Sequence, residues 1–119
     1  MVWIRCFSAT LLILIGLVGC GRSGAQVTVL NHAGVAIGNI ILSGSGWSAS
    51  IARIEPSSAQ TLTVHPRGES GLTIAFQSEG RSFSYPEKGY FEGTGDYHVT
   101  VTIETDLTAT VESRLEWLR

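Results

Sequence analysis

The sequence predicts an all-β protein: a single antiparallel β-sandwich of seven or eight strands, preceded by a cleaved signal peptide. Segments in which apolar and polar residues alternate recur from Gln26 to the end of the chain. Turn-forming residues separate these segments at intervals of about 8–12 residues, which is typical of sandwiches. An apolar stretch after a basic residue at the N-terminus predicts export. The 119 residues have room for one domain.

Residues 1–19 have the composition of an export signal. Arg5 is their only charge, and an almost wholly apolar stretch follows from Phe7 to Val18. A helix that spans a bilayer needs roughly 17–25 apolar residues, so this stretch is too short for a permanent span. We therefore expect a signal peptide over residues 1–19.

The segment Leu17-Val18-Gly19-Cys20 resembles the lipobox of bacterial prolipoproteins, in which Gly or Ala precedes an invariant cysteine. The resemblance implies cleavage between Gly19 and Cys20 and attachment of a diacylglyceryl group to the Cys20 thiol. A thiolate is nucleophilic enough to take the lipid as a stable thioether. Two or three acyl chains then hold a protein stably on a membrane. The alternative is a plain secretory signal with an incidental cysteine.

Residues 20–25 are expected to be the lipidated cysteine and a short tether, and residues 26–119 the sandwich domain. The residue after Cys20 is Gly21 and not Asp. By resemblance to the sorting of enterobacterial-type lipoproteins, this implies the outer membrane, facing the periplasm. The tether Gly21–Ala25 reaches at most about 17 Å at roughly 3.4 Å per residue, so the domain is expected to lie close to the bilayer.

Cysteine usage and charge exclude several classes of function. Cys6 leaves with the signal and Cys20 carries lipid, so the mature domain has no thiol for a disulfide, a zinc site or a nucleophile. The chain has eight Lys and Arg residues and ten Asp and Glu residues, so it has no excess of positive charge with which to bind nucleic acid. We predict no nucleic-acid partner and no cofactor.

Val and Thr fill the alternating segments, as a half-buried pleated surface prefers. The regular segments, in chain order, are 26–29, 61–65, 72–77, 97–104 and 108–115. Ile37–Leu42 is apolar on both faces and is expected to be a central strand. Ser48–Ile54 and Arg81–Tyr85 alternate less regularly and are also expected to be strands. Val111–Arg119 fits a helical stripe as well, and the alternation favours a strand.

Turn signals stand between the strands, at 31–34, 43–46, 56–58, 66–69, 78–80 and 93–96. The order of segments resembles an immunoglobulin-like or transthyretin-like sandwich, and the chain resembles small lipoproteins of the bacterial envelope. The features that carry the resemblance are Ile54-x-Pro56, the turn over 66–72 and the segment Gly89-Tyr90-Phe91-Glu92-Gly93. A similarity to the transthyretin-like lipoprotein of type VI secretion machines stays at the level of fold. It implies no activity.

Three groups of residues are candidates for chemistry, and none has a specific pattern. His32, His65 and His98 could bind zinc if the fold brought them together; otherwise they are exposed or edge histidines. A Ser-His-Asp arrangement with Asp96 or Asp106 is available, but no serine lies in a GxSxG context.

Glu87, Glu92 and Asp96 could supply paired carboxylates, although a small sandwich offers little cleft. We predict no catalytic residue and no metal site, and we expect that the protein is not an enzyme.

Aromatic residues give the predicted partner surface. Tyr85, Tyr90 and Phe91 lie in or beside an expected loop over Pro86–Gly89, and Trp47 lies on another loop or strand start. Aromatic side chains are enriched at interface hot spots. Alternatively, Tyr85, Phe91 and Trp47 close the ends of the core, and a partner binds elsewhere, for example at an unpaired strand edge.

The sequence therefore favours a lipid-anchored periplasmic binding or accessory module that holds an envelope protein. The alternative is an inhibitor or immunity lipoprotein against a toxin or hydrolase, which also needs only a complementary surface. A small metal-dependent or hydrolytic enzyme is the third hypothesis.

Overall fold

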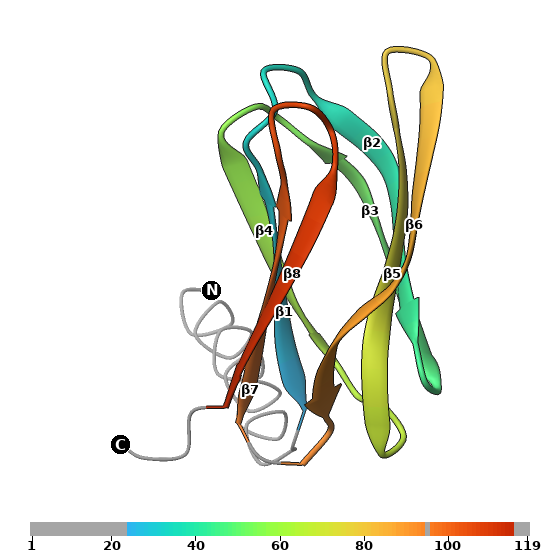
Figure 1. Ribbon diagram of the computed structural model, residues 1–119, viewed down its shortest axis with the longest axis vertical. Coiled ribbons are helices and arrows are strands. Elements are labelled where there is room, and N and C mark those ends of the chain that lie inside the picture. The colour runs from blue at the N-terminus through green and yellow to red at the C-terminus, as the bar shows by residue number, and fades with distance from the viewer. Residues whose placement is uncertain (1–23, 95, 116–119) are drawn as a thin grey trace, which may run out of the picture.

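The computed structural model describes residues 24–94 and 96–115, which form eight β-strands. These are β1 (Ala25–Asn31), β2 (Ile37–Gly44), β3 (Trp47–Ile54), β4 (Ser58–Val64), β5 (Glu69–Ser78), β6 (Arg81–Glu92), β7 (Tyr97–Ile103) and β8 (Ala109–Leu115). The β1 sheet has the order β4-β1-β7-β8 and the β2 sheet the order β3-β2-β5-β6, and the two pack face to face (Figure 1). The prediction of a sandwich with seven or eight strands is confirmed. The described residues contain no helix long and apolar enough to cross a membrane.

One strand pair departs from the predicted antiparallel arrangement. β1 and β7 run parallel, with Val27 beside Val99 and Val29 beside Val101. The other pairs between the described strands are antiparallel, so the prediction of a purely antiparallel sandwich was wrong at this pair. Alternation with period two tells which face a side chain takes and nothing about the direction of the neighbouring strand.

The expected strands appear, and one of them is longer than expected. β2 lies between β3 and β5, which confirms Ile37–Leu42 as a central strand. Ser48–Ile54 and Arg81–Tyr85 are also strands. β6 continues through Pro86–Gly89, where a loop was expected, so that prediction was wrong. Two register shifts against β5 and a positive φ of 79° at Gly89 carry the edge strand through this segment.

The two ends of the described chain are strands. β1 begins at Ala25, one residue before the expected start of the domain. The last described segment pairs with β7 from Ala109 to Leu115, so the strand prediction is confirmed there and the helical alternative is wrong for these residues. Residues 116–119, the predicted signal peptide and Cys20 lie outside the described residues.

The core lies between the two sheets, where the inward-facing side chains of both meet. Phe76 and Phe91 are its largest fully buried side chains, and Phe76 stacks on Phe83 with 5.1 Å between ring centroids. The other large core residues are Val27, Val29, Ile37, Ile40, Leu42, Leu72, Ile74, Val99, Val101 and Ile103. Burial of one such side chain contributes about 1.5–3 kcal/mol to stability.

A buried asparagine closes the end of the sandwich at which β1 stops, the Asn31 end. The Asn31 side chain is fully buried. Its Nδ2 donates to the carbonyl oxygens of Val35, Ile54 and Glu55 at 2.9, 3.1 and 3.2 Å, and its Oδ1 accepts from the Ala33 N–H at 2.9 Å. One amide thus fixes the loop after β1 against the end of β3, and every buried side-chain polar atom in the described residues has a hydrogen-bond partner.

Candidate functional site

The four aromatic residues of the predicted partner surface lie in different environments. Phe91 is fully buried, and Trp47 and Tyr85 are partly buried against the core. Tyr90 is the exception, because 46% of it is exposed. The structure therefore places Tyr90 on the surface and gives Phe91 to the core, and whether Tyr90 contacts a partner stays a prediction.

Trp47 is held by hydrogen bonds and ring packing near the opposite end of the sandwich, the Ala25 end. Its Nε1 donates to the Ser70 Oγ at 3.0 Å, and the centroid of its ring lies 6.0 Å from that of the Phe91 ring. The Ser70 Oγ also accepts from the Ser45 N–H at 3.0 Å and donates to the Gly71 carbonyl at 2.6 Å. These contacts hold the Trp47 indole against Ser70 and the buried Phe91 ring.

Tyr90 lies among carboxylates at the Ala25 end. Its hydroxyl donates a hydrogen bond to the Glu92 carboxylate, and its ring packs edge-on against Tyr97 at 6.3 Å. Glu69 is the direct cross-strand neighbour of Glu92. The bond to Glu92, reinforced by desolvation and by these negative charges, raises the pKa of Tyr90 to about 12. Tyr90 is therefore a neutral donor with a defined orientation.

The three carboxylates considered for catalysis have separate partners. The Glu87 Oε2 accepts from the Gly71 N–H at 2.9 Å, Glu92 accepts from Tyr90, and the Asp96 Oδ1 lies 3.6 Å from the His98 Nε2. Each of these contacts joins the carboxylate to a neighbouring strand or to a residue two positions away in the chain.

The three histidines lie at opposite ends of the sandwich. His32 follows β1 at the Asn31 end, whereas His65 follows β4 and His98 lies at the start of β7, both at the Ala25 end. Asp106 is in the turn before β8, where bonds from the Thr108 hydroxyl and N–H lower its pKa. Within residues 24–94 and 96–115, no group of three or more His, Cys, Asp or Glu side chains is placed to hold a metal ion.

Lipid attachment at Cys20 and cleavage after Gly19 concern residues outside the described range. Gly24 is the first described residue, and β1 starts directly after it. Lipidation stays a prediction from the sequence.

The outer face of the β2 sheet is a feature that the sequence interpretation missed. Ile41 is its centre and is 52% exposed. Ser50 and Ala75 flank Ile41 on β3 and β5, and Ser84 lies beyond Ala75 on β6. This row of four outward residues crosses the whole sheet without a charge. We call it, together with the adjoining outward residues Asn39, Ala52, Gln77 and Ser82, the Ile41 face.

A shallow hollow of about 540 Å³ lies over the Ile41 face. The outward side chains named above line it, and the inward-facing Ile40, Ile51, Phe76 and Phe83 complete the lining. Asn39, at a positive φ of 46°, donates from its Nδ2 to the Gln77 Oε1 at 2.7 Å and fixes the rim. The hollow thus has an apolar floor and a rim of hydroxyl and amide groups.

A sequence signal for this face exists in the small residues of two strands. Ser50 and Ala52 alternate with Ile51 and Arg53 along β3, and Ser82 and Ser84 alternate with the larger Phe83 and Tyr85 along β6. These positions could be assigned to one sheet only after the strand order was known, because β3 and β6 are its two opposite edges.

Comparison with known proteins finds a similar fold and no family. No family model matches the chain, and no curated protein matches its sequence. A protein from Eubacterium rectale, solved by NMR, is similar in structure with a TM-score of 0.59, over 83% of this chain and 96% of that chain. The two sequences are 13% identical, so the likeness shows the β-sandwich fold and carries no activity.

Proposed function

We propose that the protein is a lipid-anchored binding or accessory module of the bacterial cell envelope, which holds a protein partner on the Ile41 face. The observation that carries the proposal is the exposed Ile41 in a four-strand surface row without a charge. The lipobox resemblance at Leu17–Cys20 supports the anchor and a position on the outer membrane, facing the periplasm. An immunoglobulin-like or transthyretin-like build is part of the same proposal.

The chemistry of the Ile41 face suits a protein partner. Charged residues are depleted from the cores of protein interfaces, as they are from the row Ser50–Ile41–Ala75–Ser84. The hollow offers an apolar floor for one large partner side chain, and the hydroxyls and amides around it can bond to partner backbone. Small side chains on a sheet lose little rotamer entropy when they are covered.

Tyr90 supplies a second possible contact region at the Ala25 end. Its ring is exposed and oriented by Glu92 and Tyr97. An oriented aromatic side chain loses little entropy on binding. A variant of Tyr90 therefore belongs in the same test as a variant of Ile41.

Crosslinking in living cells tests the proposal. The tagged full chain is expressed as the wild type and as the variants Ile41→Lys, Tyr90→Ala, Thr110→Lys and Cys20→Ala, and copurifying proteins are identified by mass spectrometry. Thr110 is the matched control, because it is exposed on the other sheet. Its hydroxyl donates to the Glu104 carboxylate, and a lysine at position 110 can pair with the same carboxylate.

We expect one dominant envelope protein with the wild type and with Thr110→Lys. A lysine at position 41, buried by the partner, should reduce the recovery of that envelope protein by about tenfold or more, since an unpaired charge in an interface costs several kcal/mol. Equal recovery with Ile41→Lys would refute the Ile41 face, and a loss confined to Tyr90→Ala would move the contact to Tyr90. A toxin or hydrolase as the captured protein would assign the inhibitor or immunity function instead.

A further inference from the structure

The two long sides of the sandwich differ in how their strand edges are protected. Each sheet has two edge strands: β4 and β8 in the β1 sheet, and β3 and β6 in the β2 sheet. An edge strand presents unpaired N–H and C=O groups, and natural proteins protect such edges with charges, prolines or bulges. β6 and β8 lie along one side, and β3 contacts β4 along the other.

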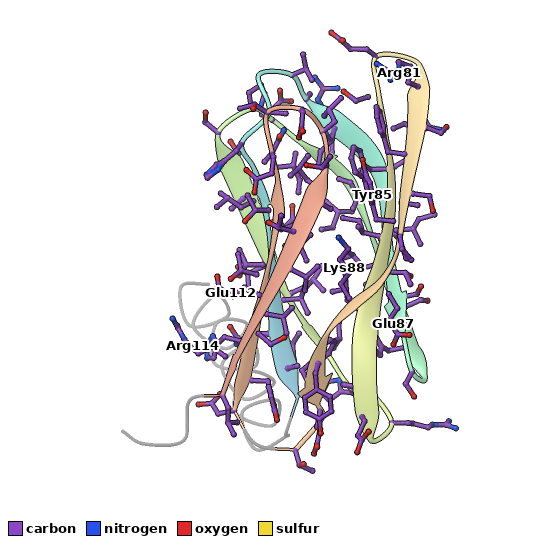
Figure 2. All side chains as sticks on the ribbon, in the orientation of Figure 1. Arg81, Tyr85, Glu87, Lys88, Glu112 and Arg114 are labelled. Atoms are coloured by element: carbon purple, nitrogen blue, oxygen red, sulfur yellow. The ribbon has the colours of Figure 1, made fainter. Side chains whose placement is uncertain are left out.

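The side formed by β6 and β8 carries these protecting features. β6 contains Pro86 and two register shifts against β5. Figure 2 shows Lys88 projecting into the space between β6 and β8, while Glu112 and Arg114 project from β8 on the outer side. A second chain could not extend either sheet at this side without meeting a charge or a proline.

β4 has none of these features. Its seven residues, Ser58–Val64, include no charged residue and no proline, and they pair with β1 without a register shift. Five of the seven are exposed. The neighbouring edge, β3, is also uncharged until Arg53 near its end.

The hydrogen bonds of β1 show which backbone groups of β4 point outward. The His32 N–H bonds to the Ile103 carbonyl on the β7 side, and the Asn31 carbonyl accepts from Ser57 on the β4 side. Backbone groups alternate in direction along a strand, so the odd-numbered residues of β1 bond to β4. Their partners on β4 are the even-numbered residues. The N–H and C=O groups of residues 59, 61 and 63 therefore point away from the sheet.

We propose that β4 is an interface between two copies of this chain, which pair antiparallel along β4 around a two-fold axis at Thr61. In this register Thr61 faces Thr61 of the partner subunit, and Ala59 faces Thr63 of the partner subunit. Each facing pair can exchange two N–H···O bonds, because the groups of both residues point outward. The result is one continuous sheet of eight strands.

The residues of β4 favour a second copy over an unrelated strand. A two-fold axis brings each residue near its own equivalent, so a charge at the centre would repel its copy, as Glu112 would if β8 formed such a pair. β4 has no charge to repel. The Thr61 Oγ1 already bonds to the Thr28 Oγ1 at 2.8 Å, and the pairing extends this row of hydroxyls into the partner.

The pairing is compatible with two anchored chains and does not depend on the anchor. Thr28 pairs with Thr61, so it lies level with the two-fold axis, and Ala25 lies three residues before it. The two copies of Ala25 are displaced in opposite directions from the axis, and at about 3.4 Å per residue they lie about 20 Å apart along the strand direction. Both tethers can then reach one bilayer that is perpendicular to the two-fold axis. Anchoring in one plane also raises the effective concentration of each copy for the other.

Cysteine crosslinking of the full chain in cells tests the register. Residues 24–115 contain no cysteine, and the wild-type chain controls for Cys6 and Cys20. Facing residues of an antiparallel pair have Cα atoms about 5.5 Å apart, within the range that a disulfide bridges. The copies of residue 59 lie about 14 Å apart, outside it. We expect a disulfide dimer with Thr61→Cys, none with Ala59→Cys or Thr63→Cys alone, and a dimer when these two are co-expressed.

Lysine variants test whether the pairing holds the copies together without a crosslink. Two differently tagged full chains should copurify from cells when both are wild type and when both carry Thr110→Lys. The amount of copurified chain should fall at least about fivefold when both carry Thr61→Lys. A folded, protease-resistant Thr61→Cys chain that gives no dimer would overturn the proposal. A crosslink from position 61 to a different protein would overturn it too, in favour of a foreign strand. Two differently tagged chains that both carry Ile41→Lys should still copurify, which would show that the copies do not pair through the Ile41 face.

Discussion

The hydroxyl of Tyr85 donates a hydrogen bond of 2.8 Å to the backbone carbonyl of Leu107. Tyr85 belongs to β6 in the β2 sheet, and Leu107 lies in the turn between β7 and β8 of the β1 sheet. Figure 2 shows the Tyr85 side chain between the two sheets. Leu107 has a positive φ of 69°, and its N–H bonds to the Glu104 carbonyl. One phenol therefore holds a constrained turn of one sheet against the other.

Replacing Tyr85 by Phe should lower the free energy of unfolding by about 1–2 kcal/mol, because the partly buried Leu107 carbonyl loses its donor while the ring packing is kept. Urea denaturation followed by circular dichroism measures the change. The matched control is Tyr97→Phe, whose ring packs on the exposed Tyr90. An equal loss in both variants would contradict the role of the Leu107 bond.

Replacing Asn31 by Ala should be more destabilising, by about 2–4 kcal/mol. The variant removes one amide that bonds to four backbone groups, and it leaves the Ile54 carbonyl buried without that donor. Thermal and urea unfolding both report the loss. Asn39→Gly is the control: Asn39 is exposed at a positive φ of 46°, where glycine is unstrained, so its stability should change little.

Two glycines should respond in opposite ways to the same substitution. A Cβ at Gly44 would overlap the Ser70 hydroxyl, the Trp47 indole nitrogen and the Gly71 carbonyl, whereas nothing lies within 4 Å of a Cβ at Gly34. Gly44→Ala should therefore cost about 2 kcal/mol or more, since the fixed Trp47–Ser70 bond must shift. Gly34→Ala should be neutral or stabilise slightly by restricting the unfolded chain. Comparable melting temperatures for the two variants would count against the packing at Gly44.

The pKa of Tyr90 makes stability depend on pH in the alkaline range. The folded-state pKa is about 12, above the ordinary value of 10.0. The folded protein holds this proton more tightly than the unfolded chain, so the contribution is complete below pH 10 and is lost as pH rises towards 12. Ultraviolet titration should show one late tyrosine, and Glu92→Gln should return it towards 10. A late tyrosine that persists in Tyr90→Phe would assign the shift to another residue.

Lipidation rests on Cys20. The full chain should incorporate radioactive palmitate, and Cys20→Ala should abolish the label and leave unprocessed precursor, because no other group at the predicted cleavage site is a nucleophilic thiol. Labelling that continues in Cys20→Ala would contradict the anchor. Cys6→Ala is the control and should be labelled like the wild type.

The strands were predictable because alternation is a local property of the chain. Val27 and Val29 face the core in β1, and Val99 and Val101 face it in β7, as their spacing predicts. Ile41 shows where that inference ends. Its segment reads as apolar on both faces, and β2 is indeed central, but Ile41 points to solvent because nothing covers the outer face of that sheet in the described chain.

The sequence by itself determined the all-β class, the strand positions and a candidate lipid-attachment cysteine, since each depends on residues that are close together in the chain. The tertiary structure alone decided that β1 and β7 are parallel, that Phe91 is buried while Tyr90 is exposed, and that β4 is an unprotected edge. These features depend on which strands become neighbours. Neighbours are chosen by the combined packing of two sheets, and no local pattern of side chains encodes that choice.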